Sequence, residues 1–199
     1  MARRNDHSHQ EIREMALNNV KLYLEEHSHH ELSLRKLAKS IGYVPSTLVN
    51  IFGSYNLLLL RSIAQTLDEL MQRIALGIEN STTSEEALKA IAYCYYDFAK
   101  QHPNRWQLIF EHNMNGELLP EWQEDRINQI MTMLESIIRT INPSKSDGDI
   151  VVTSRVIWAS VHGITQLSVD DLFFSGLPFD GHQLIDNLFD NYINQWKIS

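Results

Sequence analysis

The stretch Ser33–Phe52, SLRKLAKSIGYVPSTLVNIF, predicts two short helices joined by a tight turn. Leu34, Leu37, Ala38 and Ile41 recur at i, i+3, i+4 and i+7, so they form one apolar stripe on the first helix. Gly42 stands where the chain reverses, and Pro45 suits the start of the second helix because no N–H is required there. The pattern is typical of a helix-turn-helix, whose second helix enters the DNA major groove.

The polar residues of this stretch are candidates for DNA contacts. On the second helix, the expected base-edge contacts are Ser46, Thr47 and Asn50, while Leu48, Ile51 and Phe52 are expected to pack inward. The expected phosphate contacts are Ser33, Arg35, Lys39, Tyr43 and Tyr55. The alternative is a helical protein-interaction module without sequence-specific DNA binding, in which the helix pair serves only packing. Salt-dependent DNA binding by the purified protein would distinguish the two.

The surrounding sequence resembles a known family. Ile12–Leu60 is similar to the N-terminal domain of the tetracycline-repressor (TetR) family of bacterial transcription regulators, through IREMALNNVKLYLEEH, LSLRKLAKSIGY, the Ser-Thr-Leu of the second helix, Phe52-Gly53-Ser54 and Leu57-Leu58. Trp158, His162 and Gly163 resemble the Trp-x-x-x-His-Gly signature of one kind of TetR C-terminal domain. The resemblance implies a ligand-responsive transcription regulator, usually a repressor.

Four positions depart from the family pattern. Val44 stands where a Ser or Thr normally caps the recognition helix, so a cap worth roughly 1 kcal/mol is missing. Val49 and Ile51 replace a Tyr and a His, and Tyr55 replaces a Lys. Because the family's Tyr and Lys hold phosphates, we expect Tyr55, Ser46, Thr47 and Asn50 to contribute more of the contacts.

The expected fold is all-α, with about nine helices in two domains. Residues 1–54 are expected to form a three-helix DNA-binding domain, and residues 55–199 an effector-binding and dimerisation domain. Helices are expected over 10–27, 56–79, 83–101, 103–111, from 120, over 149–175 and over 181–197. SKSDGD at 144–149 is expected to be a linker.

The C-terminal region carries the expected partners. The last two helices have more apolar surface than one monomer needs, which favours a two-fold homodimer that spaces two recognition helices about one DNA turn, roughly 34–36 Å, apart. The resemblance implies a cavity for a small, mainly apolar effector. The candidate lining residues are Tyr95, Phe98, Trp106, Phe110, Met131, Trp158, His162 and Gln166. Each of these is also compatible with ordinary core packing, and His162 with a core histidine bonded to a backbone carbonyl.

Composition limits the other function classes. The net charge is −8, but residues 1–56 carry +1 and residues 57–199 carry −9, so the acidic surplus lies outside the predicted DNA-binding domain. The N-terminal MARRNDHSHQ is followed by no apolar run, and no stretch is apolar enough to cross a bilayer, so we expect a cytoplasmic protein without membrane contact. Arg3 and Arg4 lie in a polar leader that is either a solvated tail or a DNA-contacting arm.

Catalytic and metal-binding motifs are not recognisable in the sequence. It contains no nucleophile elbow, phosphate-binding glycine loop or dinucleotide fingerprint, so we expect neither an enzyme nor a cofactor. The single cysteine, Cys94, excludes an internal disulfide. His7, His9, His27, His29 and His30 form two small groups in a tail and a turn, without suitably spaced carboxylates, and we expect no metal site there.

Overall fold

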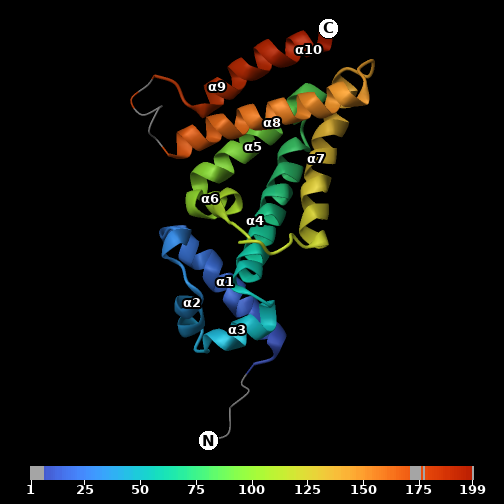
Figure 1. Ribbon diagram of the computed structural model, residues 1–199. Coiled ribbons are helices and arrows are strands. Elements are labelled where there is room, and N and C mark those ends of the chain that lie inside the picture. The colour runs from blue at the N-terminus through green and yellow to red at the C-terminus, as the bar shows by residue number, and fades with distance from the viewer. Residues whose placement is uncertain (1–6, 171–175, 177, 199) are drawn as a thin grey trace, which may run out of the picture. The chain divides into compact units, whose positions relative to one another are not determined.

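The computed structural model describes residues 7–170, 176 and 178–198, and all regular elements in these ranges are helical (Figure 1). This confirms the predicted all-α class. The chain divides into two compact units: unit 1 comprises Met1–Leu67 and Asn104–Leu119, and unit 2 comprises Asp68–Pro103 and Pro120–Ser199. The functional boundary at residue 54 stays a prediction. Within the described part, none of the helices combines the length and the hydropathy that a bilayer crossing requires.

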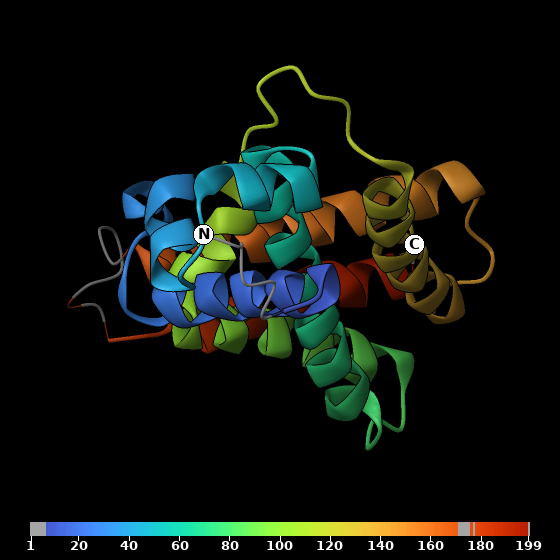
Figure 2. The same ribbon diagram turned by 90° about the horizontal axis from the view of Figure 1, so that it is seen from below.

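Unit 1 is built around its first helix, α1 (His9–Glu26), which begins with a capping box between Ser8 and Glu11. A short 3-10 turn, η1 (His29–Glu31), leads to α2 (Leu34–Ser40) and α3 (Pro45–Phe52). In both views α1 lies beside α2 and α3 (Figure 1, Figure 2), and it contacts both of them. Their common core contains fully buried aliphatic side chains: Ala16, Val20, Leu24, Leu37, Ala38 and Leu48.

The helix pair α2–α3 has the predicted turn chemistry. Ser33 caps α2 by accepting a hydrogen bond from the Lys36 amide at 3.3 Å. Gly42 has φ +78°, a left-handed conformation that glycine adopts without steric penalty. Pro45 is in the first turn of α3, and the N-cap residue Val44 makes no side-chain capping bond. Two short helices therefore meet at an abrupt corner, and the second lacks the cap that a Ser or Thr would supply.

Unit 2 is centred on α5 (Ser84–Gln101), which lies in the predicted range 83–101 and opens with a capping box between Thr83 and Glu86. This helix packs against α7 (Glu121–Ile141), α8 (Asp147–Val169) and α9 (Gly181–Leu188). After α9 follow a π-helical turn, η2 (Phe189–Ile193), and α10 (Asn194–Ile198). The core of the unit includes the fully buried side chains of Leu88, Phe98, Ile138, Ile150 and Ile185. Two connecting helices complete the chain: α4 (Tyr55–Ile78) begins in unit 1 and ends in unit 2, and α6 (Pro103–Glu111) starts the second segment of unit 1.

One local prediction was wrong, and a second is tested only in part. The supposed linker at 144–149 is partly helical, because α8 begins at Asp147 and Ser146 caps it by accepting from the Asp149 amide at 3.2 Å. Acidic residues in a first turn favour a helix N-terminus, so this polar run starts a helix. The helix expected over 149–175 ends at Val169, and its predicted continuation through 171–175 lies outside the described residues.

Candidate functional site

The orientation of α3 is fixed by side chains of α1. The Arg13 guanidinium donates from Nη2 to the carbonyl of Ile51 at 3.3 Å and lies 5.9 Å from the ring centroid of Phe52. A cation at the carbonyl end of a helix also interacts favourably with the helix dipole. Ser40 Oγ at the end of α2 donates to Asn19 Oδ1 at 2.7 Å. Both helices of the pair are thereby attached to α1.

The three base-contact candidates of α3 lie toward solvent. Ser46 and Asn50 are exposed and Thr47 is half-buried, whereas Leu48 is fully buried. Val49 is 38% exposed, so this face also carries one apolar side chain of a size suited to contact a thymine methyl group. The helix therefore presents hydroxyl, amide and methyl groups, all of which occur in direct readout of bases.

The phosphate candidates of α2 differ in their surroundings. Arg35 and Lys39 are exposed. Ser33 is half-buried and its oxygen already serves as the α2 cap. Lys36, between them, donates to the carbonyl of Glu31 at 2.6 Å. Arg35 and Lys39 are therefore the cations of this helix best placed to meet a DNA backbone.

The two tyrosine candidates are less accessible than these cations. Tyr43 is half-buried and its hydroxyl lies 2.8 Å from Nδ1 of His7. Tyr55 is half-buried at the start of α4, and burial, with a smaller effect from Tyr23, raises the pKa of Tyr55 to about 12. Its hydroxyl therefore stays protonated and can act as a hydrogen-bond donor. Arg3 and Arg4 lie outside the described residues.

A carboxylate that the sequence analysis missed lies at the junction of α3 and α4. Ser54 Oγ accepts from the Leu57 amide at 3.0 Å and donates to Glu117 Oε2 at 2.7 Å. The other carboxylate oxygen of Glu117 accepts from Asn56 Nδ2 at 2.8 Å. Ser54 and Glu117 are 63 residues apart, so no local pattern indicated this contact. It attaches the loop after α6 to the junction that follows the recognition helix.

Three of the eight predicted effector contacts form one group in unit 2. Tyr95 and His162 are joined by a hydrogen bond of 2.8 Å between the phenolic oxygen and Nδ1. The indole of Trp158 stacks on the His162 ring, with centroids 5.4 Å apart and planes 21° apart. Burial lowers the pKa of His162 below its ordinary value. The group thus combines a neutral imidazole with two aromatic rings, a surface suited to an apolar molecule with one polar atom.

The other five candidates are distributed differently. Trp106 is fully buried in unit 1, with its ring centroid 5.0 Å from that of Phe110. In unit 2, Phe98 is fully buried, Met131 is half-buried, and Gln166 donates to Asp170 Oδ2 at 2.7 Å. Six of the eight candidates therefore belong to unit 2, and the other two, Trp106 and Phe110, belong to unit 1.

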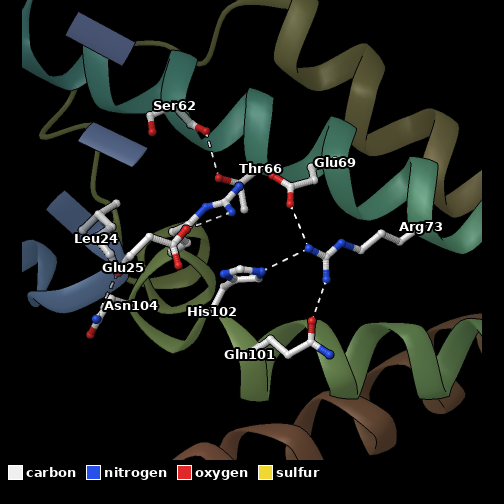
Figure 3. A network of polar contacts seen from close by, with 10 residues as sticks. Leu24, Glu25, Ser62, Thr66, Glu69, Arg73, Gln101, His102 and Asn104 are labelled. Atoms are coloured by element: carbon white, nitrogen blue, oxygen red, sulfur yellow. Dashed lines mark hydrogen bonds and ion pairs between the residues drawn. The ribbon is translucent and has the colours of Figure 1, made fainter. Parts of the chain in front are cut away.

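Unit 2 also contains a polar network around Arg73 of α4 that the sequence did not indicate. Figure 3 shows its guanidinium directed toward Glu69, Gln101 and His102, at 3.0, 2.8 and 3.1 Å. The same guanidinium lies 5.0 Å from the ring centroid of Phe98. Figure 3 also shows, within unit 1, Asn104 bonded to the carbonyl of Leu24 at 3.1 Å. Arg73 thereby joins α4 to the C-terminal end of α5.

Comparisons with known proteins identify this architecture. None of the curated proteins is significantly similar in sequence. Among solved structures, a protein of unknown function from Rhodococcus sp. RHA1 has a TM-score of 0.77 and 18% identity, with 98% of each chain covered. The TetR family transcriptional regulator PfmR from Thermus thermophilus has a TM-score of 0.58 and 17% identity, covering 90% of this chain and 94% of PfmR. AibR, solved in complex with isovaleryl coenzyme A and operator DNA, has a TM-score of 0.59 and 14% identity, covering 91% of this chain and 95% of AibR.

The family assignment comes from a family model. Residues 88–192, more than half of the chain, match the model for the C-terminal domain of tetracycline-repressor-like proteins. The three solved structures share the fold over 90% or more of this chain. The chain belongs to the TetR family of transcription regulators.

Proposed function

We propose that this chain is a repressor that binds operator DNA as a homodimer and leaves it when a small, mainly apolar effector binds. The observation that carries the DNA-binding part is the exposure of Ser46 and Asn50 on a helix that Arg13 attaches to α1. These side chains offer donors and acceptors to base edges, and Arg35 and Lys39 offer charge to phosphates. Tyr43, Ser33 and Tyr55 are secondary contacts in this proposal.

The dimer is proposed to form through α8. Val152 and Val156 are 62% and 39% exposed and lie four residues apart, on the same face of the helix. Gly163 continues this region, and a Cβ added there would meet no atom within 4 Å. An apolar row with a small residue allows close approach of a second copy about a two-fold axis. This region lies within residues 88–192, which match the family's C-terminal domain model, the part of the chain expected to dimerise.

The effector is proposed to bind beside Tyr95, Trp158 and His162. The hydrogen bond between Tyr95 and His162 joins α5 to α8, so a ligand that replaces it changes how these helices are held. Because α4 continues from unit 1 into unit 2, a movement of the helices of unit 2 can be transmitted along α4 to the DNA-binding unit. Effector and operator then favour different states of the dimer, and each lowers the affinity for the other. AibR, of similar fold, was solved with isovaleryl coenzyme A and operator DNA.

The proposal is tested by selecting bound sequences from random DNA with the purified protein. We expect a two-fold symmetric consensus with half-sites about one helical turn apart, and binding that weakens with salt. Repeating the selection with candidate effectors identifies those that release the DNA. Tighter binding with an effector would indicate an activator or co-repressed regulator. Absence of any consensus and of any salt dependence would favour the protein-interaction module.

We propose binding rather than catalysis as the role of this chain, with the cytoplasm as its location. The observation relevant to catalysis is the pair of Tyr95 and His162, which has the elements of a proton-transfer site. An enzyme would convert a ligand in a reaction that Tyr95→Phe abolishes. A regulator would bind the same ligand and return it unchanged, which mass spectrometry after dissociation can establish.

A further inference from the structure

The turn between α1 and α2 brings two adjacent histidines to the end of α6. Glu111 Oε2 lies 3.4 Å from Nε2 of His29 and 3.0 Å from Nε2 of His30. The two imidazole rings have centroids 4.0 Å apart. One donor atom from each of the three residues lies within 4.8 Å of the other two. All three residues belong to unit 1, and the carboxylate comes from a distant part of the sequence.

We propose that His29, His30 and Glu111 form a binding site for a divalent first-row transition-metal ion such as Zn²⁺. Imidazole nitrogen and carboxylate oxygen are both ordinary zinc ligands, with bonds of about 2.0–2.2 Å in a tetrahedral arrangement. Two such ligand atoms are then about 3.3 Å apart. The distances of 3.4 and 3.0 Å from Glu111 Oε2 to the two imidazole nitrogens already approach this value.

The ligand number and exposure define the kind of site. Three protein ligands leave one tetrahedral position open to water, as at open zinc sites, whereas closed structural zinc sites have four protein ligands. The side chains of His30 and Glu111 are 72% and 40% exposed, so an ion can reach them from solvent. The His29 side chain is only 9% exposed, and its ring is therefore held in place.

The surroundings of the three ligands indicate moderate affinity. Histidines that bind metals usually donate the remaining ring N–H to a carboxylate or carbonyl, which strengthens the metal bond. Nδ1 of His29 is buried, and no residue in the described ranges forms a hydrogen bond with it. The three ligands are thus suitable for a metal ion, but within the described part of the chain the ring of His29 lacks the hydrogen bond that would strengthen its bond to the metal. We infer an exchangeable ion rather than a permanent structural one.

Such an ion would join η1 to the last residue of α6. The segment it holds directly precedes α2, so metal binding restrains the chain immediately before the helix-turn-helix. Without metal, the same residues form an ion pair whenever a histidine is protonated. The inference concerns metal binding alone and does not depend on the proposed repressor function.

The test is titration of the full-length protein with Co²⁺ and Zn²⁺, followed by d–d absorption for Co²⁺ and by competition with a chromophoric chelator for Zn²⁺. We expect one ion per chain. Glu111→Gln, which keeps the shape of the side chain, and His30→Gln should each weaken binding by about 10- to 100-fold or more, since changes beyond the ligands already have effects of that size. Zn²⁺ should also raise the Tm of the original chain but not that of Glu111→Gln.

The matched control is His27→Gln, because His27 is a neighbouring histidine that contacts Tyr23 rather than Glu111. This variant should bind metal as the original chain does. Equal affinity in the original chain, Glu111→Gln and His30→Gln would overturn the proposal, as would loss of binding in His27→Gln. Absence of binding to the original chain would show that the three residues form an ion pair only.

Discussion

Asn50 is the exposed side chain of α3 whose chemistry suits base recognition best, because its amide has donors and an acceptor in one plane. An Asn bidentate to adenine N6 and N7 contributes about 1–3 kcal/mol of discrimination. Lys39 on α2 is exposed too, but its ammonium is suited to phosphates and carries no sequence information. The two residues are therefore expected to affect different properties of DNA binding.

Asn50→Ala should reduce affinity for the selected operator by about 10-fold, within the range of a lost bidentate contact, and leave binding to unrelated DNA unchanged. Lys39→Ala should weaken binding to all sequences and reduce the salt slope by about 1. Fluorescence anisotropy at several salt concentrations measures both effects. If Asn50→Ala retains the full preference for the operator, Asn50 does not contact a base.

His162 links the proposed effector group to the pH dependence of stability. Its pKa in the folded protein is lowered by burial, so the unfolded chain binds protons more readily than the folded chain does. Its neutral form is the one that the fold accommodates. The stability that depends on this form is fully present above the ordinary histidine pKa, about 6.5, and is lost as the pH falls from there through the lowered value.

His162→Gln should therefore make the free energy of unfolding less sensitive to pH between about 7.5 and 5, since Gln does not titrate there. Urea unfolding at a series of pH values measures the change. Tyr95→Phe is the matched variant, because it removes the hydrogen bond but leaves His162 in place and should retain the pH dependence. Identical pH profiles for His162→Gln and the original chain would contradict the assignment to burial of His162.

At the scale of elements, α3 is a short helix with an incomplete N-terminus. Val44 stands at the N-cap, where no side chain accepts a hydrogen bond from the first turn, and it is 52% exposed. A Ser at this position can accept from a first-turn amide without disturbing the core.

Val44→Ser should raise the free energy of unfolding by about 1 kcal/mol through capping. Val44→Ala supplies no acceptor and, as an exposed substitution, should stay within about 0.5 kcal/mol of the original chain. Equilibrium urea denaturation compares the three proteins. Equal values for Ser and Ala would show that a side-chain cap contributes nothing at this end of α3.

The sequence predicted those helix starts and turns whose signals lie in residues adjacent along the chain. The α2–α3 corner follows from Gly42 and Pro45, and the start of α5 follows from Thr83 and Glu86, because each signal lies within one turn of helix. The run SKSDGD was misinterpreted because Ser and Asp favour both linkers and helix N-termini.

The contacts that the sequence could not predict join distant segments. Glu117 bonds to Ser54, and Glu111 approaches His29, but no spacing rule connects residues on separate helices or loops. The same limit applies to the effector candidates. Aromatic residues at helical spacing indicate a buried face, but only the packing of α5 on α8 brings Tyr95 to His162. The candidate DNA-binding residues could be named from the sequence because most of them lie on one short stretch, and their contacts with DNA stay a prediction.

At the scale of the whole molecule, the proposed homodimer would combine two weak half-site contacts into one specific complex. One copy of α3 reads few bases, and the basic residues beside it are few. Two copies on a two-fold axis multiply the contacts and fix the half-site spacing. The exposed valines of α8 are the proposed contact.

Val156→Asp should convert the proposed dimer to a monomer and abolish operator binding, because the proposed two-fold axis would bring two carboxylates into an apolar interface at a penalty of several kcal/mol each. Sedimentation velocity and anisotropy measure the two outcomes. Leu76→Asp is the control, since Leu76 is 65% exposed on α4 and lies outside the proposed interface. A Val156→Asp protein that remains dimeric would place the interface elsewhere.

Unit 1 takes its residues from two separated parts of the chain. Its second segment contributes Asn104, which bonds to Leu24, Arg105, which pairs with Glu25 at 3.4 Å, and Glu117, which bonds to Ser54. An engineer who grafts only the amino-terminal third onto a different sensor would leave these attachments behind. A chimera that preserves unit 1 must also include residues 104–119. Natural recombination at a single crossover meets the same obstacle, because it cannot transfer two separated segments together.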